Sequence, residues 1–210
     1  MERDTFMRAA LTPARTEEAR ELLIAVINII PEPFFTDPAS VRDYHGERDG
    51  EGGLACHSLE VASIAIVLMP LYGISEANAL IHDLLLCAGV LHDTFKRINA
   101  CPACRGLGEV GIPDRFRGGV ATCLTCSGVG EVWGHTCREH GFIAGDRIER
   151  IGGNSDFVKA VAVMVCSHMT WWGDPSLDMN TLSREERIIA HADYLSAQSK
   201  LQGWGTFHID

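Results

Sequence analysis

The apolar run from Leu84 to Asp93, with the sequence LLLCAGVLHD, constrains the fold more than any other stretch of this chain. A run of this length and composition is typical of a buried core helix. It ends in His92 and Asp93, side by side at positions that should also be buried. Burying such a pair costs free energy unless a partner compensates it, and a metal ion can do so because imidazole and carboxylate are both good ligands. The stretch therefore predicts a helical core with a metal ion bound inside it.

The rest of the chain predicts further helices and one interruption. Apolar residues recur at helical spacing over 16–30, 54–69, 75–93, 138–151, 155–169 and 184–200, which we therefore expect to be helices. Ser183 and Glu186 form a capping box before the last of them. Between residues 99 and 137 this periodicity vanishes, glycine is frequent and cysteines cluster. We expect an all-α core formed by residues 1–98 and 138–210, with an inserted module at 99–137.

Composition and charge restrict the classes of function. The chain has 210 residues, 46% of them hydrophobic, and a formal net charge of -10. That charge argues against tight nonspecific binding to long nucleic acid, but not against a small phosphorylated substrate at a metal centre. We find no apolar run near the roughly 18 uncharged residues of a membrane span, and no signal-peptide pattern, so we expect a cytoplasmic protein without membrane contact. Eight cysteines in such a protein suggest metal binding more than disulfides.

Six ionisable residues lie within the expected helices and could converge on one site in their core. They are His57, His92, Asp93, His140, His168 and Asp193. Their order and their local contexts, GGLACHSLEVA, GVLHDTFK, REHGFIAGDRI, CSHM and AHADYLSA, resemble the HD-domain metalloenzyme superfamily. The nearest resemblance is to the HD domains of bacterial 3′-to-5′ exoribonucleases and of conjugative relaxases. These motifs extend over nearly all of the core and imply an HD-domain helical bundle.

The resemblance also implies two metal sites. His57, His92, Asp93 and Asp193 would bind one divalent ion, whereas His140 and His168 would bind a second, with Asp93 bridging the two. The ions expected are manganese, iron, magnesium, nickel or cobalt. One or both sites would be filled.

The function implied is that of a metal-dependent phosphohydrolase acting on a nucleotide or an oligonucleotide end through metal-activated water. Asp93 and Lys96 would be catalytic, and the candidate substrate contacts are His45, Arg138 and Arg147. The chain departs from the family pattern at Phe95, where glycine is frequent, and at Met169, where a second histidine often stands. Two alternatives stay open: a mixed-valent di-iron oxygenase acting on a small molecule, and a non-catalytic adaptor that uses its cysteine module to bind a partner.

Structural explanations compete with the metal-site interpretation. His92 and Asp93 could be a hydrogen-bonded pair, and the other histidines satisfied core residues. His82 and Asp83 form a second HD dipeptide in the same helix. About ten residues rotate a helix by nearly three turns with roughly 80° left over, so the two pairs cannot easily face one site. An exposed carboxylate at the start of the helix is the simpler explanation of Asp83.

The inserted module carries two C-x-x-C-x-G-x-G repeats, CPACRGLG at 101–108 and CLTCSGVG at 123–130. The glycines permit a tight turn that points backbone amides at sulfur, and two such knuckles complete a tetrahedral zinc site. We expect one structural zinc bound by Cys101, Cys104, Cys123 and Cys126. The repeats resemble half of a DnaJ-type zinc-finger region. A redox role for the cysteine pairs is the alternative.

Overall fold

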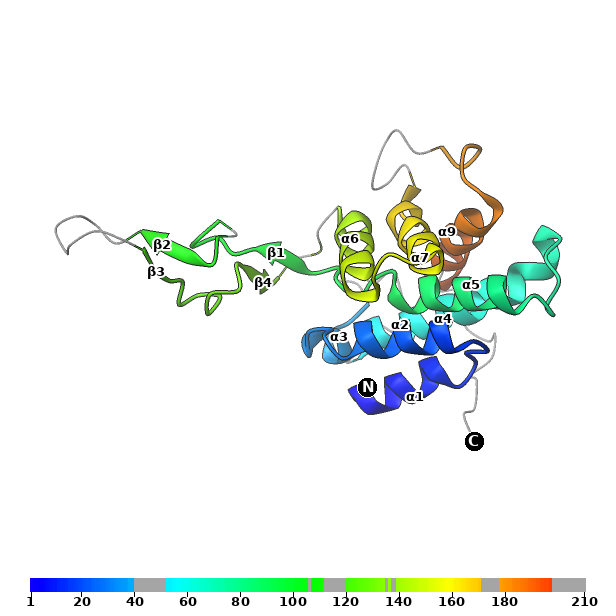
Figure 1. Ribbon diagram of the computed structural model, residues 1–210, viewed down its shortest axis with the longest axis horizontal. Coiled ribbons are helices and arrows are strands. Elements are labelled where there is room, and N and C mark those ends of the chain that lie inside the picture. Colours follow the sequence, from blue (N-terminus) through cyan, green and yellow to red (C-terminus); the bar gives the residue numbers. More distant parts are fainter. Residues whose placement is uncertain are drawn as a thin grey trace. The chain divides into compact units, whose positions relative to one another are not determined.

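The computed structural model describes residues 1–39, 52–105, 107–111, 120–134, 136, 139–170 and 178–197. The chain divides into two compact units, and Figure 1 shows the elements of each. The helical unit comprises residues 1–95 and 138–210, and the cysteine unit comprises residues 96–137. The first boundary therefore lies at Phe95, ahead of the change in composition at residue 99.

The described part of the helical unit is built from α-helices and one short 3-10 helix. They are α1 (Arg3–Leu11), α2 (Glu17–Ile27), α3 (Pro33–Thr36), α4 (Gly53–Leu68), η2 (Met69–Tyr72), α5 (Ala79–Leu91), α6 (His140–Gly152), α7 (Asp156–Ser167) and α9 (Arg184–Ala197). The expected all-α core therefore agrees with the described residues, and α1 and α3 are additions that the apolar pattern did not predict.

Side-chain caps explain where several helices begin. Before α9, the backbone N–H of Ser183 donates to Glu186 at 2.9 Å and the N–H of Glu186 donates to the Ser183 hydroxyl at 3.2 Å, which confirms the capping box. The helix expected to follow Ser75 begins later, at Ala79. Its cap is Asn78, whose side chain accepts from the N–H of Ile81 at 3.1 Å, because Ser75 instead caps a local turn.

Small residues let the core helices approach closely. α4 packs against α5 and α9, α6 packs against α7, and α5 also contacts α7 and α9. At the crossing of α4 and α5, a Cβ atom added to Gly89 would lie 2.5 Å from Cα of Ala62. At the crossing of α6 and α7, a Cβ atom added to Gly145 would lie 2.8 Å from the carbonyl oxygen of Ala162. Larger residues at these two glycines would push the helices apart.

The structure corrects the interpretation of His82 and Asp83. Asp83 is completely buried rather than exposed. Its carboxylate accepts hydrogen bonds from the backbone N–H groups of Arg15 and Thr16, from the Thr16 hydroxyl and from Nδ1 of His82, at 2.6 to 3.1 Å. These bonds outweigh the effect of burial, which alone would raise the pKa of Asp83, and leave that pKa below its usual value. The pair fixes the start of α2.

One described helical stretch, Gly53–Tyr72, is long and apolar enough to cross a membrane by length and composition alone. It consists of α4 and η2 and contains Glu60, whereas the expectation concerned a run without charged residues. The core helix of a soluble protein has the same composition when it is apolar on most of its surface. In this chain the stretch contains the completely buried His57.

Short strands form the described part of the cysteine unit. β1 (Ile98–Ala100) pairs antiparallel with β4 (Glu131–Trp133), with Ile98 opposite Trp133. β2 (Glu109–Gly111) pairs antiparallel with β3 (Val120–Thr122). The protein is therefore mainly α with two small sheets in the insert, rather than helical throughout.

Candidate metal centres

Six side chains meet in the core of the helical unit. They come from α4 (His57), the C-terminal end of α5 (His92 and Asp93), the start of α6 (His140), the C-terminal end of α7 (His168) and α9 (Asp193). Five of them are almost completely buried, and only the Asp193 side chain keeps 22% of its surface exposed. Burying this many ionisable groups is costly without compensation.

The first group of ligand atoms surrounds Nε2 of His57. This nitrogen lies 3.3 Å from Nε2 of His92 and 3.0 Å from Oδ1 of Asp193, and the latter two atoms are 3.7 Å apart. Two ligands bound to one ion at about 2.1 Å, at angles of about 90° to 120°, are about 3.0 to 3.6 Å apart. The three side chains could therefore hold a metal ion.

The second group lies around Oδ1 of Asp93. This oxygen is 3.1 Å from Nε2 of His140 and 3.8 Å from Nε2 of His168, and the two nitrogens are 3.1 Å apart. The side chains of His92, Asp93 and His168 also have ligand atoms within 4.8 Å of one another and could hold an ion. The distances again match ligands that share one cation.

Asp93 connects the two groups. Its Oδ2 lies 3.7 Å from Nε2 of His57 and 3.5 Å from Nε2 of His92. Its Oδ1 faces the other pair, His140 and His168. One carboxylate therefore lies between two pairs of imidazoles, with one oxygen directed at each, as a carboxylate that bridges two cations would be.

The electrostatic environment favours the protonation states that metal ligands need. Burial lowers the pKa of His92 more than the neighbouring carboxylates raise it. Burial, assisted by His140 and His92, lowers the pKa of His168 to about 3. Burial raises the pKa of Asp193, but the close approach of His57, whose Nε2 lies 3.0 Å from Oδ1, and the surrounding histidines outweigh this and hold the pKa below its usual value. At neutral pH His92 and His168 are therefore neutral and Asp193 is ionised, the forms that bind metal.

Backbone carbonyls orient two of the imidazole rings. Nδ1 of His92 lies 2.8 Å from the carbonyl oxygen of Gly89, and Nδ1 of His168 lies 2.7 Å from that of Val165. A carbonyl oxygen can only accept, so Nδ1 carries the proton in both rings. Nε2 is then the atom with the lone pair, and it is the atom directed at the other ligands.

Two polar residues at the centre were not predicted from the sequence. Nδ1 of His57 lies 2.9 Å from Oγ of Ser196, and that hydroxyl donates a short hydrogen bond to Glu60. Glu60 follows His57 by three residues on α4, and Ser196 follows Asp193 by three residues on α9. Residues three apart share one face of a helix, and this spacing is the sequence signal that could have identified both.

Four further residues were expected at the site, and their roles stay predictions. Lys96 is the first residue of the cysteine unit. His45 and Arg138 lie outside the described residues. The guanidinium carbon of Arg147, in α6, lies 4.9 Å from the centre of the Phe95 ring, which is a cation–π contact. Phe95 follows Asp93 by two residues in the chain. The bulky residue at position 95 is therefore a packing partner of Arg147.

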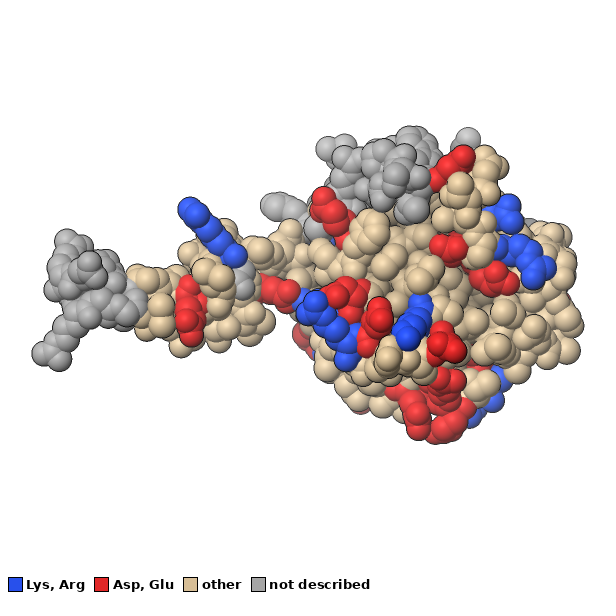
Figure 2. All heavy atoms as spheres, turned by 45° about the horizontal axis from the view of Figure 1, so that its top comes forward, with Lys and Arg blue, Asp and Glu red and all other residues tan. Residues whose placement is uncertain are grey.

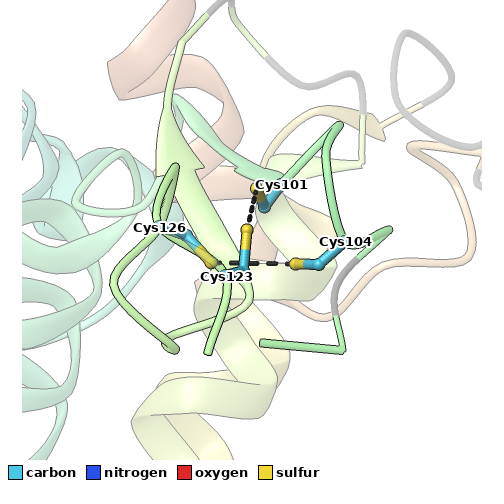
Figure 3. Close-up of side chains that lie close together, drawn as sticks. All are labelled: Cys101, Cys104, Cys123 and Cys126. Atoms are coloured by element: carbon cyan, nitrogen blue, oxygen red, sulfur yellow. Dashed lines mark hydrogen bonds between the residues drawn. The ribbon is translucent and has the colours of Figure 1, made fainter. Parts of the chain in front are cut away.

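In the cysteine unit, four thiols converge from two turns, as Figure 3 shows. Sγ of Cys101 lies 3.8 Å from Sγ of Cys123, Sγ of Cys104 lies 3.7 Å from Sγ of Cys126, and all four sulfurs are within 4.8 Å of one another. Four thiolates at about 2.3 Å from one tetrahedral zinc ion are about 3.8 Å apart. A disulfide would require about 2.05 Å. The four cysteines could therefore hold zinc.

Backbone amides around these sulfurs favour thiolates. The N–H of Gly108 donates to Sγ of Cys104 and the N–H of Gly130 donates to Sγ of Cys126, each at 3.2 Å. Hydrogen bonds from the backbone, that of Cys126 first, lower the pKa of the Cys123 thiol to about 6, whereas burial and the neighbouring thiols raise the pKa of Cys126 to about 11. The glycines thus act as the repeat pattern predicts, because each turn directs an amide at a sulfur.

Comparisons with known proteins add no relative from which a role could be transferred. No protein-family model, no curated protein and no solved structure matches this chain.

Proposed function

We propose that the helical unit is a metal-dependent phosphohydrolase that acts on a nucleotide or on the end of an oligonucleotide. The observation that carries this proposal is the position of Asp93, whose two oxygens face two separate pairs of histidines. A pair of divalent ions held this way would polarise a phosphoryl group and lower the pKa of bound water so that hydroxide is available near neutral pH.

The residues of the chain have distinct roles in this proposal. His57, His92 and Asp193 form one ligand group, and His140 and His168 form the other, with Asp93 shared. The partly exposed Asp193 side chain marks where the first group reaches solvent. Arg147, held against Phe95, is the described cation proposed to attract a phosphate, and Lys96 keeps its proposed role in neutralising charge on the leaving oxygen.

The charge of the protein favours a small substrate over long RNA. The net charge is -10. On the face shown in Figure 2, the acidic and basic side chains of the described residues are intermixed and do not form a continuous basic surface. Long nucleic acid is bound mainly by neutralising many phosphates with such a surface. A mononucleotide or a strand end needs charge compensation at one phosphate, which metal ions and one or two cations can supply.

For the cysteine unit we propose one structural zinc. Four thiolates fill a tetrahedral ion and leave no position for a substrate. The buried cluster of this unit consists of the same four cysteines, with Val110 and Val132 packed against it. Zinc would therefore stabilise the fold of the unit rather than take part in hydrolysis.

Elemental analysis of protein purified without added metal tests both parts. One zinc per chain plus one or two manganese or iron ions is the expected content, and zinc alone at one per chain contradicts the catalytic proposal. Phosphate release should be measured with bis(p-nitrophenyl) phosphate, nucleoside monophosphates and a short oligoribonucleotide. Asp93→Asn should lose the core metals and the activity while retaining zinc. Asp156→Asn, which changes an exposed carboxylate in the first turn of α7, is the matched control.

The two alternative functions predict different results in the same experiments. An iron-loaded protein that consumes dioxygen and releases no phosphate would favour a mixed-valent di-iron oxygenase. A protein in which Asp93→Asn changes neither metal content nor any activity would favour the adaptor.

A further inference from the structure

The partner of Nδ1 in His57 is a side chain, whereas in His92 and His168 it is a backbone carbonyl. His92 and His168 are the residues at which α5 and α7 end. The last carbonyl groups of a helix have no partner within it, so each of these histidines can donate Nδ1–H to a carbonyl of its own last turn. His57 lies inside α4, where the carbonyls accept from the helix itself. It needs an acceptor from elsewhere.

The structure supplies that acceptor from α9. Oγ of Ser196 lies 2.9 Å from Nδ1 of His57, and its own hydroxyl proton is donated to Oε2 of Glu60. Since the Ser196 proton is used on the carboxylate, the oxygen must accept from His57. The chain of donors therefore runs in one direction, from Nδ1–H of His57 to the hydroxyl and from the hydroxyl to Glu60. Nε2 of His57 is left without a proton, directed at Asp193 and His92.

We infer that Ser196 and Glu60 are positioning residues that fix His57 as the tautomer protonated at Nδ1, so that Nε2 can bind the first metal ion. This inference rests on the proposed metal centre and adds two residues to it. A neutral imidazole can place its proton on either nitrogen, and only one of the two forms has a lone pair at Nε2. The Glu60 carboxylate selects that form because it accepts and cannot donate when ionised.

The same bonds align α4 with α9. His57 and Glu60 lie one turn apart on α4, and Asp193 and Ser196 lie one turn apart on α9. The two pairs interlock, because His57 contacts both residues of the other helix, at 3.0 Å and 2.9 Å. Both ring nitrogens of one histidine are therefore held by a single turn of α9. Ser196 is 3% exposed, so water does not compete freely for its hydroxyl.

Three variants test the inference. Ser196→Ala removes the acceptor, and Glu60→Gln keeps the shape of the side chain but removes its charge and can donate to Ser196, which would reverse the chain of donors. Ser63→Ala is the matched control, since Ser63 also lies on α4 but its hydroxyl donates to the carbonyl of Leu59 in the same helix, at 2.9 Å. Loss of an outer residue of this kind typically weakens metal binding by about 10 to 100-fold.

Two readouts keep the inference separate from the proposed function. The first is manganese affinity, measured by competition with a chelator: Ser196→Ala and Glu60→Gln should bind about 10 to 100-fold more weakly than the wild type, and Ser63→Ala should not. The second is the ¹⁵N chemical shift of the two His57 nitrogens in metal-free protein, which reports the tautomer without any metal. The wild type and Ser63→Ala should be protonated at Nδ1, and the other two variants should gain the Nε2-protonated form.

The proposed metal centre and the role of Ser196 and Glu60 would be contradicted by different results. A wild-type protein that binds no manganese contradicts the proposed centre, and the tautomer of His57 still decides whether Ser196 and Glu60 orient the ring. If His57 in Glu60→Gln and Ser196→Ala has the same tautomer and the same manganese affinity as in Ser63→Ala, the inference is wrong even though the centre exists.

Discussion

Replacing Gly89 by alanine should destabilise the helical unit and disturb the first group of ligand atoms. Gly89 lies in α5, three residues before His92, where α5 crosses α4 at Ala62. A Cβ atom at this position would lie 2.5 Å from Cα of Ala62, 2.7 Å from its backbone nitrogen and 3.0 Å from its Cβ. Ordinary contacts between such atoms are about 3.5 to 4.0 Å. The two helices would have to separate by about 1 Å to accommodate it.

Two effects oppose each other in this substitution. Helix propensity alone favours alanine over glycine by about 1 kcal/mol. Overpacking typically costs about 1 to 3 kcal/mol, and here the cost lies at the upper end because the closest atoms belong to the backbone and cannot rotate away. We expect a net loss of about 2 kcal/mol in the free energy of unfolding. Separation of the helices would also lengthen the 3.3 Å distance between Nε2 of His57 and Nε2 of His92, and so weaken metal binding.

Urea unfolding of the metal-free protein, followed by circular dichroism, measures the stability change, and a manganese titration measures the change at the site. Gly111→Ala is the control, because nothing lies within 4 Å of a Cβ atom added there. Adding Ala62→Gly to Gly89→Ala should restore little stability, since it removes only the most distant of the three contacts. A Gly89→Ala protein as stable as the wild type, or stabilised by the propensity gain, would refute the close approach of the helices.

Other substitutions and conditions separate the roles assigned to the remaining features. Asp83→Asn should lower the free energy of unfolding by about 3 kcal/mol, because it weakens the hydrogen bonds that four donors make to the buried carboxylate. The content of core metals, measured by elemental analysis, should not change. Cys101→Ser should reduce the zinc content and leave the manganese content unchanged. In an amide NMR spectrum, the signals of residues 96–137 should be less dispersed than in the wild type. The metal-free protein should lose about 2 kcal/mol of stability between pH 7 and pH 5 in urea titrations. In that window the unfolded chain protonates His168 near its ordinary pKa of 6.5, whereas the folded protein, with a pKa of about 3, does not; stability that does not fall on acidification would contradict the burial of neutral His168.

Local patterns predicted the helices and some of their ends from the sequence. The capping box at Ser183 and Glu186 involves neighbours in the chain, so the amino-acid types alone identify it. The start of α5 was placed wrongly because Ser75 and Asn78 are both good caps, and only the path of the backbone selects between them. The cysteine knuckles were visible for the same reason as the capping box, since each is formed by a few consecutive residues.

Long-range contacts could not be predicted in this way. Asp83 and Asp93 both follow a histidine and are both buried, Asp83 within α5 and Asp93 two residues after its end. What separates them is their partners, since Asp83 meets Thr16, 67 residues away, whereas Asp93 meets histidines of other helices. Ser196 and Glu60 are 136 residues apart, so neither sequence pattern nor composition indicates that the Ser196 hydroxyl donates to the Glu60 carboxylate. Residue types reveal which groups could bind a metal, while tertiary packing decides which of them meet.

The antiparallel stem of the cysteine unit has a consequence for how the helical unit folds. β1 and β4 pair at Ile98 and Trp133, so the chain leaves and returns at points about 5 Å apart. Once the stem has formed, the connection between Asp93 and His140 outside the stem consists of residues 94–97 and 134–139, instead of all of residues 94–139. Loop-closure entropy grows with the logarithm of length, by about 0.6 kcal/mol for each doubling. Zinc loading of the insert would thereby reduce the entropy that the two halves of the helical unit lose when they assemble.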